Sequence, residues 1–212
     1  MEDYNPDDQL ANLKAWWKQY GNALIVGIVI GLVLLAGGNY WKQYKIKRAE
    51  AASQLYENLL ADWQQGKSDA VSTAAAKLMQ DYAATPYAGK SALLMARQRF
   101  DAKDIAGTRM HLEWAMKNAS ETQVRHSARL RLARLHLDQG ETAAALALAD
   151  IKDTDGFASE YAEIRGDVLL AQGDRDGARR AYQTAIEKIT RSSSYLQVLT
   201  MKRDNLGPEK AP

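Results

Sequence analysis

Residues 161–189 read YAEIRGDVLLAQGDRDGARRAYQTAIEKI and hold two amphipathic segments separated by a turn at Gly173. Apolar and small residues recur at three- and four-residue steps on both sides of this turn, which is the pattern of a helix that buries one face. Small Gly166 and Ala178 are expected where the two helices come closest, with Tyr182 filling the space beside them. The segment therefore predicts a helical hairpin.

This hairpin resembles the tetratricopeptide repeat. An early Trp and a closing Pro, two usual marks of that repeat, are replaced by Ala162 and Thr190. The resemblance implies a solenoid of stacked hairpins that binds a protein partner along one face. The residues that carry it are Gly166, Leu169, Gly173, Ala178, Tyr182 and Ala185.

Turn residues recur upstream at about the same period. The turns begin at Gly66, Lys103, Gly140 and Gly173, about 37, 37 and 33 residues apart. The hairpins before the clearest one keep only some of its small residues, and residues 194–206 predict a capping helix over the end of the stack. We predict an all-α protein in which residues 42–206 form a tetratricopeptide-like domain and residues 207–212 a disordered tail.

A membrane-spanning helix is expected over residues 19–41, because no charged residue occurs between Lys18 and Lys42. About 23 residues at 1.5 Å each cross the roughly 30 Å hydrocarbon core. Residues 1–18 then form a short tail on one side of the lipid bilayer. A cleaved signal peptide is the alternative, although the acidic start and the late apolar run speak against it.

Aromatic residues flank this segment on both sides, as interfacial anchors do. The segment also carries small residues on one helical stripe, which would let another membrane helix approach closely. Glycine is common in membrane helices, so the stripe is equally consistent with plain lipid-facing surface. The predicted anchors are Trp16, Trp17, Tyr20, Tyr40, Trp41 and Tyr44, and the stripe consists of Ala23, Gly27, Gly31 and Gly38.

Composition and motifs exclude several classes of function. The 212 residues carry a formal charge of only +2, which disfavours nucleic-acid binding by bulk charge, and they contain no cysteine. The common phosphate-loop, dinucleotide, nucleophile-elbow and zinc motifs are missing, and His111, His126 and His136 are scattered. We therefore predict no catalytic residue, no metal or cofactor site, and no small-molecule substrate.

Two arginines are candidate binding residues. Arg97 and Arg134 occupy the same register of successive first helices, so they are expected to line the groove of the solenoid and to pair with carboxylates of a bound peptide. Ordinary solvated arginines with stems packed on apolar neighbours are the simpler interpretation.

The orientation in the membrane is ambiguous. Lys42, Lys45, Lys47 and Arg48 follow the span, whereas only Lys14 and Lys18 precede it closely. Basic residues favour the cytoplasmic side, so this count would place the repeat domain in the cytoplasm, but long domains are translocated largely regardless of charge.

The whole arrangement resembles the YfgM family of bacterial inner-membrane proteins. The resemblance rests on AWWKQYGNALIVGIVIGLVLLAGGNYW after the acidic start and on EIRGDVLLAQGDRDGARRAY in the last repeat. It implies an ancillary subunit of the SecYEG translocon, with a cytoplasmic N-terminus and a periplasmic repeat domain that associates with the chaperone PpiD and passes on emerging exported proteins. The alternatives are a membrane-tethered regulator of a cytoplasmic signalling protein and an enzyme with an unrecognised site.

Overall fold

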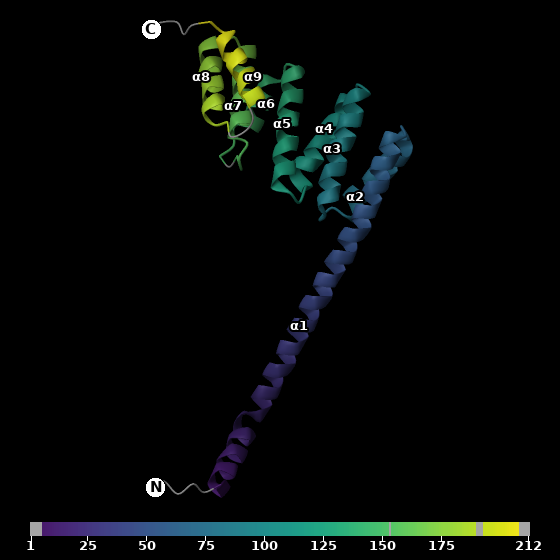
Figure 1. Cartoon of the computed structure of the whole chain (residues 1–212), viewed down its shortest axis with the longest axis vertical. Helices are drawn as coiled ribbons and strands as arrows, with labels where there is room; N and C mark the ends of the chain where they lie inside the picture. Colours follow the sequence, from purple (N-terminus) through teal and green to yellow (C-terminus); the bar gives the residue numbers. More distant parts are fainter. Residues whose placement is uncertain (1–5, 153, 190–192, 208–212) are drawn as a thin grey trace. The chain divides into compact units, whose positions relative to one another are not determined.

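The computed structural model describes residues 6–152, 154–189 and 193–207, and in these ranges the regular structure is entirely helical. The all-α prediction is thereby confirmed for the described residues. The helices are α1 (Pro6–Gln64), α2 (Ser68–Asp81), α3 (Pro86–Asp101), α4 (Ile105–Asn118), α5 (Thr122–Asp138), α6 (Thr142–Ala149), α7 (Ala158–Ala171), α8 (Arg175–Glu187) and α9 (Ser193–Asp204) (Figure 1).

The chain divides into two compact units, Met1–Glu50 and Ala51–Pro212. The described part of the first unit, residues 6–50, belongs to helix α1 and contains the apolar stretch. The stretch is long and apolar enough to cross a membrane, with a mean hydropathy of 2.0 in a window of which none is buried. Unbroken helix suits this role, because each backbone N–H and C=O is satisfied within the segment.

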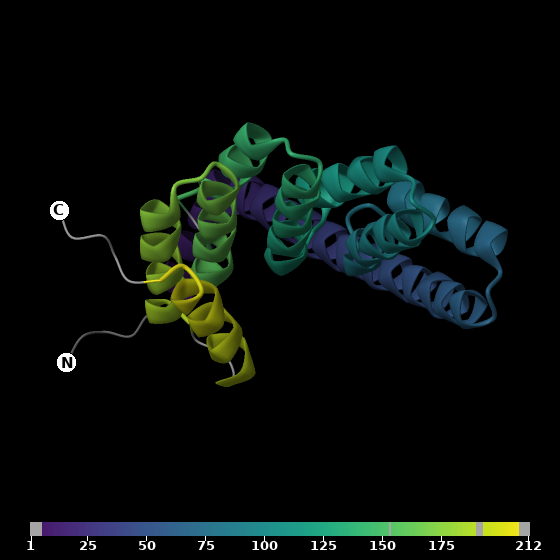
Figure 2. The ribbon, with the colours of Figure 1, turned by 90° about the horizontal axis from the view of Figure 1, so that it is seen from above.

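Four hairpins and a final helix make up the second unit. The end of α1 pairs with α2, α3 pairs with α4, α5 with α6, and α7 with α8, each across one of the predicted turns. The successive helices follow one another along the domain in chain order, from blue to yellow in Figure 2. The predicted capping helix, residues 194–206, corresponds to α9. Of the predicted disordered tail, residues 207–212, all but Gly207 lie outside the described residues.

The four hairpin turns share one backbone geometry. At the last of them, Gly173 has φ of +85° and Asp174 N–H donates to the carbonyl of Leu169 at 2.9 Å. This is the hydrogen bond that ends a helix with a left-handed residue, a position in which glycine has no Cβ to clash. Lys103 holds the same place at φ +63° in the α3–α4 turn. The equivalent bonds elsewhere are Lys67 to Asp62, Asp104 to Arg99, and Glu141 to His136.

Small side chains let the paired helices approach closely. A Cβ placed on Gly166 of α7 would lie 2.5 and 2.6 Å from two ring carbons of Tyr182 on α8. Tyr182 is itself only 1% exposed. Leu199 of α9 is fully buried and packs against Ala162 of α7 and Ala185 of α8. The capping helix therefore packs on the same two helices.

Candidate functional site

A groove of about 670 Å³ opens between the first and second repeats and the start of the third. Thirteen residues from the end of α1, from α3, from α4 and from α5 line it. These groove residues are Tyr56, Lys90, Leu93, Leu94, Ala96, Arg97, Phe100, Thr108, Leu112, Arg131, Arg134, Leu135 and Asp138. The volume lies in the range of sites that bind small molecules or several side chains of a partner.

The groove residues of α3 and α5 form two stripes, one on each helix, as helical periodicity requires. On α3 the groove residues alternate between basic and apolar at steps of three to four residues, from Lys90 through Leu94 and Arg97 to Phe100. Phe100 is 42% exposed, so an aromatic ring stands uncovered at one end of the stripe. On α5 the basic residues Arg131 and Arg134 are one helical turn apart, with Leu135 and Asp138 following.

Four cations and one carboxylate line the groove, and their existing partners differ. Arg97 Nε donates to Asp101 Oδ2 at 2.8 Å on the open surface of α3. Lys90 Nζ lies 3.8 Å from Glu121 Oε2, too far for a strong ion pair. Arg134 Nη2 donates to Glu163 Oε2 at 3.0 Å. Arg131 is exposed and, among the residues that the structure describes, makes no hydrogen bond or ion pair.

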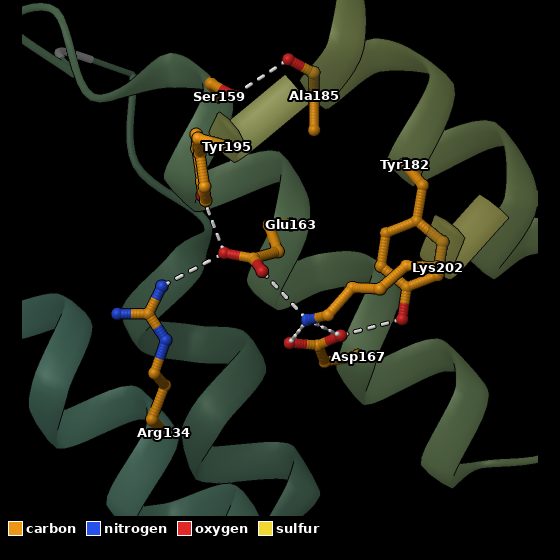
Figure 3. A network of polar contacts seen from close by, with 8 residues as sticks. All are labelled: Arg134, Ser159, Glu163, Asp167, Tyr182, Ala185, Tyr195 and Lys202. Atoms are coloured by element: carbon orange, nitrogen blue, oxygen red, sulfur yellow. Dashed lines mark hydrogen bonds and ion pairs between the residues drawn. The ribbon is translucent and has the colours of Figure 1, made fainter. Parts of the chain in front are cut away.

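Arg134 connects the groove to a second feature, a partly buried polar network between α5, α7 and α9 (Figure 3). Its centre is Glu163 of α7, whose side chain is only 7% exposed. Tyr195 donates its hydroxyl to Glu163 Oε2 at 2.7 Å, and Lys202 Nζ donates to Oε1 at 2.8 Å. The Glu163 carboxylate is thus shared by three donors from two helices besides its own.

Asp167, one turn after Glu163 on α7, completes the network. Lys202 Nζ lies 2.8 and 2.9 Å from its two carboxylate oxygens, and the hydroxyl of Tyr182 donates to Oδ1 at 2.7 Å. A separate hydrogen bond from Ser159 Oγ to the carbonyl of Ala185, at 2.8 Å, ties α7 to α8 (Figure 3). One lysine of the capping helix therefore satisfies two carboxylates of α7.

The protonation states follow from these contacts. Burial alone would raise the pKa of Glu163, but hydrogen bonds from Lys202 and Tyr195 and the nearby charge of Arg134 outweigh it, and the pKa is lowered. Burial opposes the charge on Lys202, yet its bonds to Asp167 and Glu163 raise the pKa of the ammonium. Burial and the adjacent carboxylates raise the pKa of Tyr182 and Tyr195. At neutral pH the network therefore holds the Glu163 carboxylate, the Lys202 ammonium and two neutral phenols.

The sequence analysis did not identify Arg131 in the groove, nor Glu163 and Lys202 in the polar network. Arg131 lies one turn before Arg134 on α5, so helical spacing alone could have added it to the groove. Glu163 stands between Ala162 and Ile164, an acidic residue within an apolar stretch, which signals a paired buried charge. Lys202 offered no such signal, since a lysine in the last turn of a helix is an ordinary surface residue.

The predicted membrane residues all lie on α1. Gly27, Gly31 and Gly38 have no other atom within 4 Å of a built Cβ, so the stripe is open along these three positions. The side chain of Ala23, its fourth predicted member, lies outside the described residues. The predicted anchors Trp16, Trp17, Tyr20, Tyr40, Trp41 and Tyr44 are all exposed.

Contacts along α1 join two of the predicted anchors to basic side chains. The ammonium of Lys45 lies 5.6 Å from the ring centre of Trp41. Arg48 lies 5.8 Å from the ring of Tyr44 and donates to its hydroxyl at 2.9 Å. Rings and basic groups therefore form one continuous surface after the apolar segment, of the kind found at a membrane interface.

The residues of the repeat signature surround the α7–α8 hairpin. Gly166, Ala178, Tyr182 and Ala185 are buried at the contact of the two helices, Gly173 forms the turn, and Leu169 is half-buried.

The histidines are engaged separately. His126 Nδ1 lies 2.8 Å from the hydroxyl of Tyr161, and His136 contacts Glu141. His111 is buried in α4, and burial together with the charge of Arg99 lowers its pKa. Over the described part of the chain, no group of three or more His, Asp or Glu side chains is arranged to hold a metal ion.

Comparison with known proteins covers both units. Residues 14–208 match the tetratricopeptide repeat-like domain family, which confirms the prediction of a tetratricopeptide-like fold. A relative from Escherichia coli (strain K12) is 31% identical over 208 residues, 97% of this chain and 99% of that protein. A relative from Neisseria gonorrhoeae is 27% identical over 93% of this chain and 95% of its own length, and one from Haemophilus influenzae is 25% identical over 94% and 97%. Each is named an ancillary SecYEG translocon subunit.

Proposed function

This chain belongs to the tetratricopeptide repeat-like family of ancillary SecYEG translocon subunits, and on that premise we propose that it is a membrane-anchored adaptor of the translocon. The resemblance to the YfgM family is confirmed, because the similarity to the Escherichia coli relative covers 97% of this chain, the apolar helix included. That coverage is the observation that carries the proposal. The proposed role is that of a scaffold, without catalysis.

The finer function is to link exported proteins that emerge from SecYEG to periplasmic chaperones such as PpiD. The groove supports this proposal, because it offers uncovered apolar surface beside exposed cations on a domain tethered by an apolar helix. A tether confines the groove to the neighbourhood of the membrane and raises its effective concentration toward any chain leaving a pore there.

Affinity purification of the full chain from detergent-solubilised membranes tests the adaptor function. We expect SecY and PpiD to co-purify with it in amounts well above those found with an unrelated single-span protein of similar abundance. Absence of both would refute the proposal. Recovery of SecY without PpiD would retain the translocon subunit and refute the link to that chaperone.

The proposed location is the bacterial inner membrane, with the N-terminus cytoplasmic and the repeat domain periplasmic. The basic residues after the span oppose this orientation, whereas the tether function requires it. Protease accessibility in sealed spheroplasts, with a cytoplasmic protein as control, decides between them. Digestion of the repeat domain is the expected result. Protection until lysis would favour the alternative, a tethered regulator of a cytoplasmic signalling protein.

The glycine stripe is proposed as the contact with a partner helix in the bilayer. Gly27 and Gly31 leave open space on one side of α1, and small residues allow two membrane helices to approach closely. The double variant Gly27→Ile/Gly31→Ile should reduce co-purification of SecY, while Val29→Ile/Val33→Ile, on other faces of the same helix, should not. Unchanged co-purification of the glycine variant would mean that the stripe faces lipid.

A further inference from the structure

The charge and apolar pattern of the groove defines the class of segment that fits it, and Arg131 is the central residue. Three of the four cations of the groove have a carboxylate nearby: Asp101 for Arg97, Glu163 for Arg134, and Glu121 for Lys90. Arg131 lacks such a partner in the described ranges of the chain, although it is exposed on the same face of α5 as Arg134. An arginine fork is the group best suited to bind a carboxylate through two parallel hydrogen bonds.

Apolar surface accompanies this cation. Leu93 and Leu94 of α3 are half-buried and Phe100 is 42% exposed, so these side chains retain area that a partner could cover. Burial of such area supplies most of the free energy of a peptide complex, whereas the charges determine which peptide is accepted. An occupant must therefore present apolar side chains and carboxylates together.

The stripes also set the length and the pattern of that occupant. The α3 stripe runs from Lys90 to Phe100, and ten steps of 1.5 Å along the helix span about 15 Å. This matches two to three turns of a helix or four to five residues of extended chain. Because basic and apolar groups alternate along α3, the complementary segment alternates between acidic and apolar residues.

From these features we infer that the groove binds an amphipathic acidic peptide segment, about ten residues long if helical, and that a carboxylate of this segment binds Arg131. The inference deepens the proposed adaptor function and rests on it for its biological setting. Nucleic acid does not fit the same pattern, because the aromatic residues of the groove are few and its leucines offer no stacking surface for bases.

The test uses the full chain in zwitterionic lipid nanodiscs and two fluorescein-labelled peptides of twelve residues. One peptide is built from Leu and Glu in the helical pattern LEELLEELLEEL, and in the other every Glu is replaced by Gln. Fluorescence anisotropy should show at least tenfold tighter binding of the acidic peptide, with affinity that falls as salt is added. Empty nanodiscs are the blank.

Arg131→Gln should weaken binding of the acidic peptide about tenfold and remove most of the preference for it. Arg129→Gln is the matched control, since it removes the same side chain from the same helix at a position about 200° around the axis and outside the groove. Melting temperatures of both variants close to that of the wild type would show that folding is unaffected. Equal affinity for the two peptides, or an unchanged affinity in Arg131→Gln, overturns the inference.

Co-purification of SecY with each variant separates this inference from the proposed function. If Arg131→Gln loses peptide binding and still recovers SecY, the inference is supported and the adaptor function also stands. If even the wild type fails to recover SecY while peptide binding still depends on Arg131, the adaptor function fails and the groove assignment holds.

Discussion

Lys202 anchors the capping helix through charge, and its removal tests the energetics of the partly buried network. The substitution Lys202→Met keeps most of the aliphatic stem but deletes three contacts of 2.8, 2.8 and 2.9 Å to Glu163 and Asp167. A hydrogen bond to a charged group contributes about 1.5–3 kcal/mol, and loss of one partner of a buried ion pair costs about 3–5 kcal/mol. The side chain of Lys202 is 32% exposed, so solvent screens part of this energy.

The remaining partners reduce the cost further. Glu163 retains Arg134 and Tyr195 in the variant, whereas Asp167 retains, among the residues that the structure describes, only the hydroxyl of Tyr182. We expect a loss of about 2–3 kcal/mol, which for a domain of this size lowers the melting temperature by about 4–12 °C. Differential scanning fluorimetry of the full chain in detergent measures it, and hydrogen exchange should rise first in α9.

Two controls identify charge as the cause. Lys77→Met removes an exposed lysine from the middle of α2 and should change the melting temperature by less than 1–2 °C, as surface substitutions do. The triple variant Glu163→Gln/Asp167→Asn/Lys202→Met no longer buries unpaired charge and should recover at least half of the lost stability. If Lys202→Met has the same melting temperature as Lys77→Met, the network does not hold the capping helix and the reasoning fails.

Three other substitutions follow from the packing, the turns and the protonation states. Gly166→Ala places a methyl group 2.5 Å from the ring of Tyr182 and should cost about 1–3 kcal/mol by chemical denaturation, so a stability within 0.5 kcal/mol of the wild type would contradict the close contact. Lys103→Gly relieves a left-handed residue at φ +63° and should raise stability by about 1 kcal/mol, whereas Lys67→Gly, outside that conformation, should not. Because the pKa of Glu163 is lowered from 4.5, its stabilising effect is present above that pH and is lost as pH falls through the folded value. The difference in melting temperature between wild type and Glu163→Gln should therefore be largest above about pH 5 and shrink as the pH is lowered below 4.5, and a constant difference would contradict the assignment.

The hairpins could be predicted from the sequence because their signals are local. Gly173 and Lys103 mark turns that are formed within six residues of chain, and the apolar period on either side identifies the helices. The same logic placed Arg97 and Arg134 in one register, and both line the groove. Register on a helix follows from counting, so this part of the candidate site needs no tertiary information.

The polar network could not be predicted in the same way. Lys202 bonds to Glu163 across 39 residues, and the contact exists only because α9 is seated on α7 and α8. The partner of Arg134 could not be predicted either, since Glu163 lies 29 residues further along the chain. Because Glu163 is buried, Arg134→Ala removes a partner of a desolvated carboxylate and should destabilise the domain.

The boundary between the two units falls between Glu50 and Ala51, within the residues of helix α1. Ala52 and Leu59 are fully buried in the first hairpin against Val71, Ala75 and Leu78. The repeat domain is consequently not a module that can be detached at its first turn. A soluble form, whether shed by a protease or designed for crystallisation, has to begin upstream of Ala52, because a start at Ser68 would leave the partner helix of the first repeat with its apolar face uncovered.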